Sequence, residues 1–198
     1  FNNIDFIKIP SGEINNLPLL KLIKNTNKKI LLSTGASTEN DIAKALKVLK
    51  KNKVIILHCN SAYPTPIEDL NLNSISYLKK KFKCTVGLSD HSDDIYSSII
   101  SLGLGAKVIE KHFTINNKLN GPDHKSSLNP NKLFKMIKLI RLYEKSLGDY
   151  SKKISLSELM NLKVIRKSIV AKKIIFKGEK FSKANLTCKR PGDGISPM

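Results

Sequence analysis

The sequence predicts an α/β fold in which helices cover a parallel β-sheet. Three observations lead to this prediction: short β-like runs recur along the 198-residue chain, helical patterns separate them, and polar residues follow each run. A repeated strand–helix unit is typical of parallel sheets, because a crossover helix returns the chain to the same edge. We therefore expect one sheet whose strands follow each other in chain order.

Five β-like runs are predicted to be strands. They are residues 6–9, 30–33, 54–58, 85–88 and 107–109. Apolar residues at helical spacing predict helices between the later runs: Ile42, Ala45, Leu46 and Leu49; Leu72, Ile75, Leu78 and Phe82; and Ile95, Ile99 and Leu102. Thr38 and Asp41 predict a capping box before the first of these helices. A longer helix should follow the fifth strand, opened by Asn129 and Pro130 and ended at Gly148.

Polar residues gather after every predicted strand, whereas the strand starts carry nothing comparable. The clusters are residues 8–13, 33–35, 58–61, 89–91 and 110–112. This asymmetry is typical of a (β/α) barrel with its site on one face, and an open doubly wound sheet shares it. A barrel needs about eight strands, so we expect three further strands in a missing N-terminal part.

His91 and His112 close two successive predicted strands. The strand–helix–strand unit between them should bring both imidazoles to neighbouring strand ends. Two imidazoles with open positions suit a divalent transition metal. Each histidine alone is better explained as a hydrogen-bonded residue at a strand end. Because each lies beside an acid, Asp90 or Glu110, and a polar loop follows over residues 116–125, the pair together favours a site.

A cation and three hydroxyls lie at three strand ends and are suited to a phosphate or carboxylate. They are Lys8, Ser11, Ser33 and Ser89. Each serine alone could simply cap a turn. Glu13, which follows a Gly turn, is a candidate general base or water-orienting acid. Tyr63 lies in a loop stiffened by two prolines, which could present its hydroxyl or be only a turn.

The last quarter of the chain loses the strand–helix rhythm. Residues 149–161 are predicted to be a linker, and residues 162–198 the first part of a small β-rich module. Within that module, residues 168–171 and 174–176 are expected to be strands with a turn at 177–179.

Composition narrows the class of protein. The net charge is +19, but all except three of the 35 basic residues are Lys. Arg is the residue favoured for reading bases, so we expect solvated helix faces and no nucleic-acid partner. The three scattered cysteines form no CxxC pair, which favours a reducing cytoplasm. No apolar run approaches the roughly 18 residues of a membrane span.

Eight motifs in order resemble the bacterial N-acetylneuraminate (sialic acid) synthases. They are Lys8-Ile-Pro-Ser-Gly-Glu13, Leu32-Ser-Thr-Gly35, Leu57-His-Cys59, Tyr63-Pro-Thr-Pro66, Gly87-Leu-Ser-Asp-His91, Glu110-Lys-His-Phe-Thr114, Gly121-Pro-Asp-His-Lys125 and Lys189-Arg-Pro-Gly192. The resemblance implies strands four to eight of a TIM (β/α)8 barrel over residues 1–148. It also implies that residues 162–198 begin a small β-rich SAF (antifreeze-like) domain.

The resemblance further implies a reaction. These synthases condense phosphoenolpyruvate with N-acetylmannosamine and release phosphate. His91 and His112 would bind a metal, first of all Mn²⁺, with Mg²⁺ or Co²⁺ as alternatives, and would act with Glu13 in catalysis.

The resemblance assigns the remaining motif residues to the two substrates. Lys8, Ser11, Ser33, Ser61 and Ser89 match positions that hold phosphoenolpyruvate, with Asn60 as a one-residue alternative to Ser61. Tyr63, Asp123 and Arg190 match positions that face the amino sugar. In family dimers this arginine reaches the partner's site, so a domain-swapped homodimer is expected. Asp193 departs from the family pattern, which has Asn there.

Two alternatives stay open. A legionaminic acid synthase, or another nonulosonate synthase of the family, shares these motifs and uses a 6-deoxy diacetamido sugar in place of N-acetylmannosamine. The Gly121–Lys125 motif argues against a pseudaminic acid synthase, and the Lys189–Gly192 motif favours the bacterial type acting on the free sugar. The second alternative is an inactive, truncated sugar-binding fragment.

Overall fold

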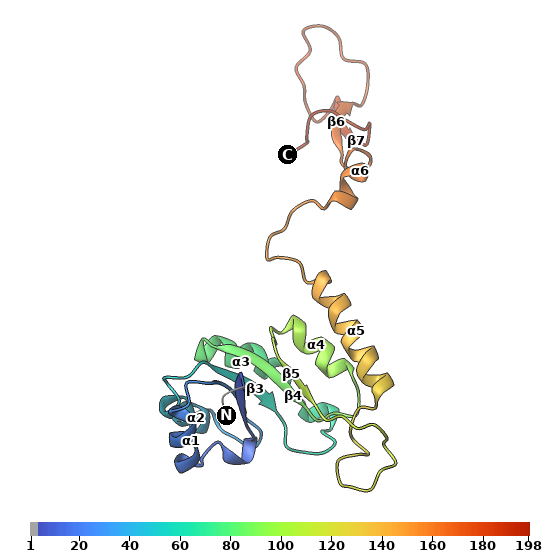
Figure 1. Ribbon diagram of the computed structural model, residues 1–198. Helices are drawn as coiled ribbons and strands as arrows, with labels where there is room; N and C mark the ends of the chain where they lie inside the picture. The colour runs from blue at the N-terminus through green and yellow to red at the C-terminus, as the bar shows by residue number, and fades with distance from the viewer. Residues whose placement is uncertain (1–3) are drawn as a thin grey trace. The chain divides into compact units, whose positions relative to one another are not determined.

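The computed structural model describes residues 4–198 (Figure 1). They form two compact units, and the boundary between the units lies between Gly148 and Asp149. The first unit contains the predicted sheet and the second contains a short hairpin-like sheet. Each unit is described by itself.

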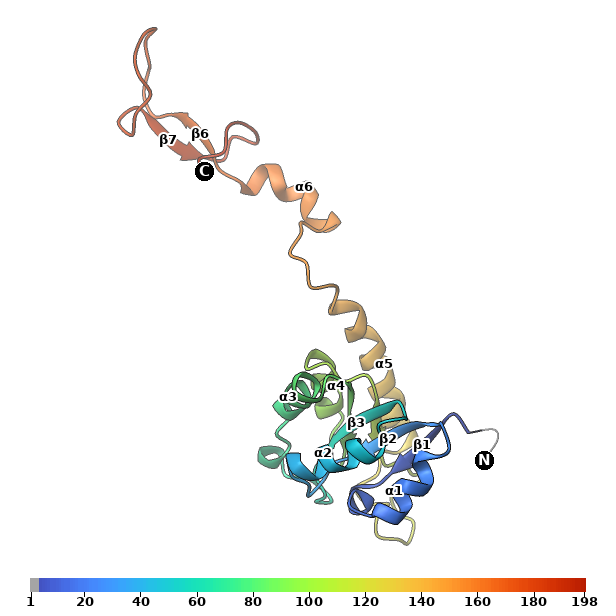
Figure 2. The ribbon, with the colours of Figure 1, turned by 90° about the vertical axis from the view of Figure 1, so that its left-hand side faces the viewer.

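The first unit is built on a five-stranded parallel sheet whose strand order is the chain order, β1-β2-β3-β4-β5 (Figures 1 and 2). The strands are β1 (Phe6–Ile9), β2 (Lys29–Ser33), β3 (Val54–Cys59), β4 (Thr85–Asp90) and β5 (Ile109–Lys111). The sheet curls into a half-barrel. Chain-order pairing of parallel strands is the consequence of one crossover helix between each pair.

All five predicted strands are confirmed. The bounds of β2, β3 and β4 differ from the prediction by one or two residues at one end, and the fifth strand is shifted along the chain. The fifth was predicted at 107–109, whereas β5 runs to Lys111. Its pairing extends further because Asp90 at the end of β4 is the register partner of Lys111. The predicted segment still bonds to β4, through Lys107 N to Val86 O at 2.8 Å.

Helices cover one face of the sheet. They are α1 (Leu17–Lys24), α2 (Glu39–Val48), α3 (Asn73–Phe82) and α4 (Tyr96–Gly103), followed by the longer α5 (Pro130–Ser146). The capping box of Thr38 and Asp41 is present at α2, and Asn129 caps α5 by accepting a hydrogen bond from Lys132 N. Helix α1 was not among the predicted helices, although Asn16 caps it by accepting from Leu19 N.

The main core lies between the sheet and these helices. Buried strand residues, including Ile9, Leu32, Ile56 and Val86, pack against buried helix residues, including Leu20, Ile42, Ile75 and Leu78. A second, smaller core joins α4 and α5 through Ile95, Leu128 and Met136. Because successive side chains of a strand point to opposite faces, filling one face with this core leaves the other face for different residues.

The second unit contains α6 (Leu156–Ile165) and two antiparallel strands, β6 (Ser168–Ala171) and β7 (Leu186–Lys189). Two expectations are corrected here. The predicted linker at 149–161 includes the first part of α6, which starts with a capping box of Ser155 and Glu158. The predicted strand at 174–176 is absent from the described structure, because Phe176 and Glu179 hydrogen-bond to each other in a turn.

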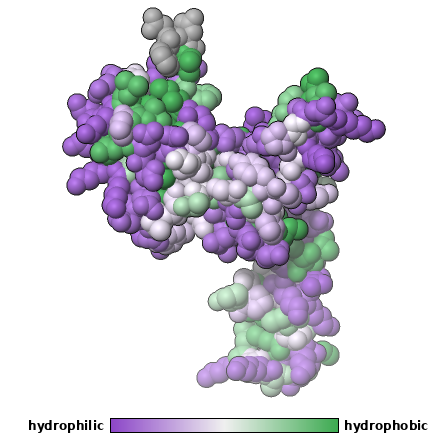
Figure 3. Space-filling model, turned by 90° about the horizontal axis from the view of Figure 1, so that it is seen from below, coloured by the Kyte–Doolittle hydropathy of each residue, from purple (hydrophilic) through white to green (hydrophobic). Residues whose placement is uncertain are grey.

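The described surface carries many charged side chains, and hydrophilic residues cover much of the face seen in Figure 3. Lys44, Lys47, Lys50 and Lys51 are all exposed on or just after α2, as the helical pattern predicts. Among residues 4–198, no helix is both long and apolar enough to cross a membrane.

Candidate active site

The ends of the strands bring the predicted polar residues together on the face opposite the helices. Ser89 on β4 and Glu110 on β5 are register partners, and Ser89 Oγ donates a hydrogen bond to Glu110 Oε1 at 2.7 Å. Lys8 Nζ on β1 lies 3.4 Å from the same Glu110 oxygen. Since β1 and β5 are the two outer strands of the sheet, this contact requires the sheet to curl.

The two histidines meet at the same edge. Their ring centroids lie 5.4 Å apart with the rings nearly perpendicular. Tyr63 stacks on His91 at 4.0 Å and lies 5.3 Å from His112. Partial burial, followed by the nearby Cys59, Asp123 and Glu110, raises the pKa of the Tyr63 phenol. Tyr63 is therefore a neutral hydroxyl donor at neutral pH, placed against both imidazoles.

Hydrogen bonds determine which ring nitrogens are free. His91 Nδ1 lies 2.6 Å from the backbone oxygen of Asn60. A carbonyl oxygen only accepts, so Nδ1 carries the proton and Nε2 keeps its lone pair. Ser89 Oγ lies 3.4 Å from Nε2, but its proton is directed to Glu110. His112 Nδ1 faces Asp123 Oδ2 at 3.8 Å, which is longer than a hydrogen bond, so this carboxylate is a neighbour of the ring and does not fix its tautomer.

This donor set fits a divalent metal ion with two protein ligands. Metal-binding histidines usually direct their second nitrogen to a carbonyl or carboxylate, which orients the ring. His91 has such a partner, and a carboxylate lies near the ring of His112. Within residues 4–198 there is no group of three or more His, Cys, Asp or Glu side chains suited to a metal ion. The described residues therefore offer a metal ion two imidazole ligands.

Three serines lie at the neighbouring strand ends. Ser11 Oγ accepts a hydrogen bond from Gly35 N at 2.9 Å. A Cβ atom built on Gly35 would lie 2.2 Å from Ser61 Oγ and 2.9 Å from Ser11 Oγ. These hydroxyls therefore converge on a position that only glycine can occupy.

Ser33 is buried, with 1% of its surface exposed, and its hydroxyl has no hydrogen-bond partner. A buried hydroxyl without a partner costs about 1–3 kcal/mol. A ligand oxygen at this strand end would remove that cost, so Ser33 fits an anion-binding role.

The remaining predicted residues lie as follows. Glu13 ends the short 3-10 helix η1 (Ser11–Glu13), and its carboxylate accepts from Asn16 Nδ2 at 2.5 Å. The Asn60 side chain is bonded within its own loop, to Ala62 N and Asp69 O. Arg190 is exposed in the second unit, directly after β7. The roles of Glu13 and Arg190 stay predictions.

Asp90 and Lys111 point away from this site. They form an ion pair of 3.1 Å on the helix-covered face, with side chains 0% and 3% exposed. Burial raises the pKa of Asp90, but Lys111 and the hydroxyls of Ser98, Ser92 and Ser97 outweigh it and hold the pKa below its usual value. Asp90 is therefore a buried carboxylate compensated by a cation and hydroxyl donors.

Sequence reasoning missed three features of the site: the link that Glu110 makes between Lys8 and Ser89, the Asn60 carbonyl and the close approach at Gly35. Glu110 and His112 are two residues apart on one strand, so strand alternation already places both on one face. The two backbone features depend on loop geometry and leave no signal in the sequence.

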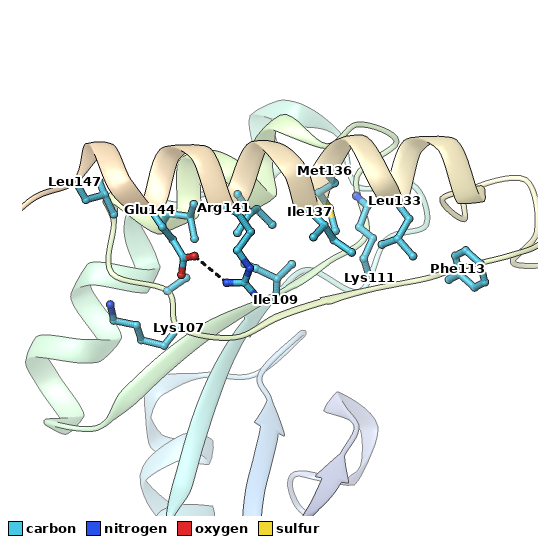
Figure 4. A pocket seen from close by; sticks show the side chains of 13 residues that line it. Lys107, Ile109, Lys111, Phe113, Leu133, Met136, Ile137, Arg141, Glu144 and Leu147 are labelled. Carbon is cyan, nitrogen blue, oxygen red and sulfur yellow. Dashed lines mark hydrogen bonds and ion pairs between the residues drawn. The ribbon is translucent and has the colours of Figure 1, made fainter.

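An apolar cavity of about 390 Å³ lies elsewhere, between α5 and β5 (Figure 4). Ile109, Met136 and Ile140 line it, and Arg141 pairs with Glu144 at 2.8 Å on its rim. None of the predicted site residues lines this cavity, so we do not assign the chemistry to it.

A curled half-barrel of parallel strands, with its polar site at the strand ends, defines the chain as a (β/α)-barrel-type protein. Comparison with known families then identifies the family to which the chain belongs. Residues 2–152 match the sequence model of the NeuB family, and the chain belongs to this family.

Several relatives are named as synthases of related sugar acids. The N,N'-diacetyllegionaminic acid synthase of Campylobacter jejuni (serotype O:2) is 50% identical over 98% of this chain, and a C. jejuni pseudaminic acid synthase is 40% identical over 96%. The N-acetylneuraminic acid synthetase of Leptospira borgpetersenii, solved with citrate, superposes with a TM-score of 0.76 at 33% identity, covering 80% of this chain and 56% of its own. The chain spans 60% and 56% of the two curated relatives.

We predict that Gly35→Ala weakens binding of inorganic phosphate, used as a probe of the anion site, to the full-length protein about 10- to 100-fold. The added methyl group displaces Ser61 and Ser11, and each hydrogen bond to a charged group contributes about 1.5–3 kcal/mol. Isothermal titration calorimetry measures the change. Gly12→Ala is the matched control, because a Cβ atom there meets nothing within 4 Å. Equal affinities for the two variants would show that the anion binds elsewhere.

Proposed function

We propose that this chain is part of a nonulosonate synthase, which joins phosphoenolpyruvate to an open-chain N-acetylated amino sugar and releases phosphate. The observation that carries the proposal is one strand-end cluster in which an imidazole pair adjoins an anion site. Ser89 connects the two parts, because its hydroxyl contacts both Glu110 and His91. Membership of the NeuB family supports the proposal.

The anion site is assigned to phosphoenolpyruvate. Its members are Lys8, Ser11, Ser33, Ser61 and Ser89, of which Lys8 supplies positive charge and the serines supply hydroxyl donors. Glu110 lies between Lys8 and Ser89, and its contacts with both side chains hold them in place. Glu13 is assigned the role of orienting a water molecule.

The sugar is assigned to the imidazole side. Asp123 accepts hydrogen bonds from sugar hydroxyls, and Tyr63 donates from its neutral phenol. His91 and His112 would hold a divalent metal ion, Mn²⁺ first, which when bound supplies Lewis acidity to the sugar's aldehyde oxygen.

In the reaction, carbon 3 of phosphoenolpyruvate forms the new C–C bond with the aldehyde carbon. Water then adds at carbon 2, and phosphate leaves as the bond from carbon 2 to the phosphate oxygen breaks. Glu13 orients this water and takes its proton. The aldehyde oxygen takes up a proton and becomes a hydroxyl.

Two sugars fit this proposal. The motifs at Tyr63 and Gly121–Lys125 led us to expect N-acetylmannosamine. The relative with 50% identity is named a legionaminic acid synthase, which supports the 6-deoxy diacetamido sugar equally well.

Competition between the two sugars decides between them. Full-length protein with phosphoenolpyruvate should release phosphate and prefer one sugar by at least tenfold in kcat/KM, which is about 1.4 kcal/mol of transition-state discrimination. Preference for N-acetylmannosamine makes the protein a sialic acid synthase, and preference for the diacetamido sugar makes it a legionaminic acid synthase. Binding of either sugar without phosphate release would reject the enzyme and favour a sugar-binding fragment.

Metal dependence is the next expected property. Full-length enzyme treated with a chelator should lose activity and regain it with Mn²⁺. The pair of imidazoles suits a divalent transition metal, and Mn²⁺ is the ion that the family resemblance implies. The His91→Ala, His112→Ala double variant should not recover. His124→Ala is the matched control, since the His124 side chain bonds to Thr114 Oγ1 at 2.7 Å. Full turnover by the double variant in metal-free buffer contradicts the assignment.

We also propose that residues 162–198 begin a SAF domain, and that three further strands complete the barrel in the full-length protein. In a domain-swapped homodimer, Arg190 would reach the sugar site of the partner protomer. Arg190 is exposed in a loop after β7, which supports this role. The boundary between the two compact units, after Gly148, supports it as well. The three free cysteines agree with a cytoplasmic reaction.

Arg190→Ala should raise the KM for the sugar and leave that for phosphoenolpyruvate nearly unchanged. The mixing test combines Arg190→Ala protomers with protomers disabled at His91 and His112. If sites are shared, mixed dimers contain one intact site, and activity exceeds that of either parent. Mixed dimers that form but restore no activity would place Arg190 in its own protomer's site or outside any site.

A further inference from the structure

The buried ion pair of Asp90 and Lys111 fixes the alignment of β4 and β5. The two residues are register partners, and their charged atoms lie 3.1 Å apart. Two residues back along the strands, on the same face of the sheet, the register partners Leu88 and Ile109 are apolar. A slip of one residue would turn the buried charges to the opposite face. The charged pair therefore permits one register only.

Hydroxyl groups surround this pair and hold it in place. Ser92, Ser97 and Ser98 each donate to Asp90, at 2.6–2.7 Å. Lys111 Nζ also donates to the backbone oxygen of Ser92, at 2.5 Å. The network thus joins the end of β4, the following loop, the first turn of α4 and the end of β5.

The same network includes residues that are next to both histidines in the sequence. Asp90 and Ser92 are the neighbours of His91 in sequence, and Ser92 N donates to Asp90 Oδ1 at 2.9 Å across it. Lys111 directly precedes His112. Since neighbouring residues point to opposite faces, fixing Asp90 and Lys111 on the helix side fixes the imidazoles on the site side.

We infer that Asp90 and Lys111 are positioning residues that set the spacing of the His91 and His112 imidazoles for a divalent metal ion. The inference rests on the metal site of the proposed function. A role in stability alone is the weaker explanation, because a buried ion pair is often no more stabilising than an apolar pair of the same size. Specifying a register is the best-attested use of such groups.

The test measures Mn²⁺ binding to full-length protein without substrates, from the electron paramagnetic resonance signal of free Mn²⁺. Lys111→Met and Asp90→Asn should weaken Mn²⁺ binding about 10- to 100-fold, as expected for groups that orient metal ligands. Ser98→Ala removes one hydrogen bond to Asp90 and keeps the ion pair, so it should fold and lose less affinity. Circular dichroism gives the folded fraction and the Tm of each variant.

Leu20→Ala is the control for destabilisation, because Leu20 is a buried residue of α1 that packs in the main core. It should lower the Tm and leave Mn²⁺ affinity unchanged. Wild-type affinity in folded Lys111→Met or, if that variant does not fold, in Ser98→Ala overturns the inference, as does an equal loss in Leu20→Ala. If the wild-type protein binds no Mn²⁺, or the double histidine variant binds it equally well, the metal site itself is wrong and the inference falls with it.

Discussion

The structure of the first unit depends on the alternation of side chains along β4 and β5. Ser89 and Glu110 face one side, and their neighbours Asp90 and Lys111 face the other. On the inner side the Glu110 side chain is 35% exposed and bonds to the buried Ser89. On the helix side a carboxylate and an ammonium group compensate each other in a buried layer. A charge is tolerated in such a layer only when it is paired and hydrogen-bonded. The same two strands therefore serve the core and the site.

Curvature of the sheet is the second requirement. In a flat sheet β1 and β5 would be separated by three strands, yet Lys8 contacts Glu110. The site is thus assembled from the two outer strands as well as from adjacent ones. This explains why residues far apart in the sequence, from Lys8 to Asp123, belong to one cluster.

Much of this arrangement could be predicted from the sequence, because strand runs, helix caps and polar strand ends are local patterns. The five strands and the caps at Thr38 and Asn129 are examples. Helix α1 was missed although Asn16 caps it. The strand predicted at 174–176 is wrong because the turn there depends on a contact with Glu179. The contacts of Gly35 and of the Asn60 carbonyl are tertiary, so no local pattern contains them. The substrate is a finer question than the fold or the cluster, since relatives that are 50% and 40% identical to this chain are named for different products.

The contact between His91 and Asn60 has a consequence for how this chain tolerates mutation. The acceptor is a main-chain oxygen, so it persists whatever side chain occupies position 60. A codon change there leaves the acceptor atom in place, and can affect the imidazole only by moving the loop. Substitutions of residue 60 by Lys or Ile, which are abundant in this sequence, therefore have little effect on the orientation of the His91 imidazole. The orientation of His91 thus tolerates substitution at position 60 because a backbone atom, and not a side chain, accepts its hydrogen bond.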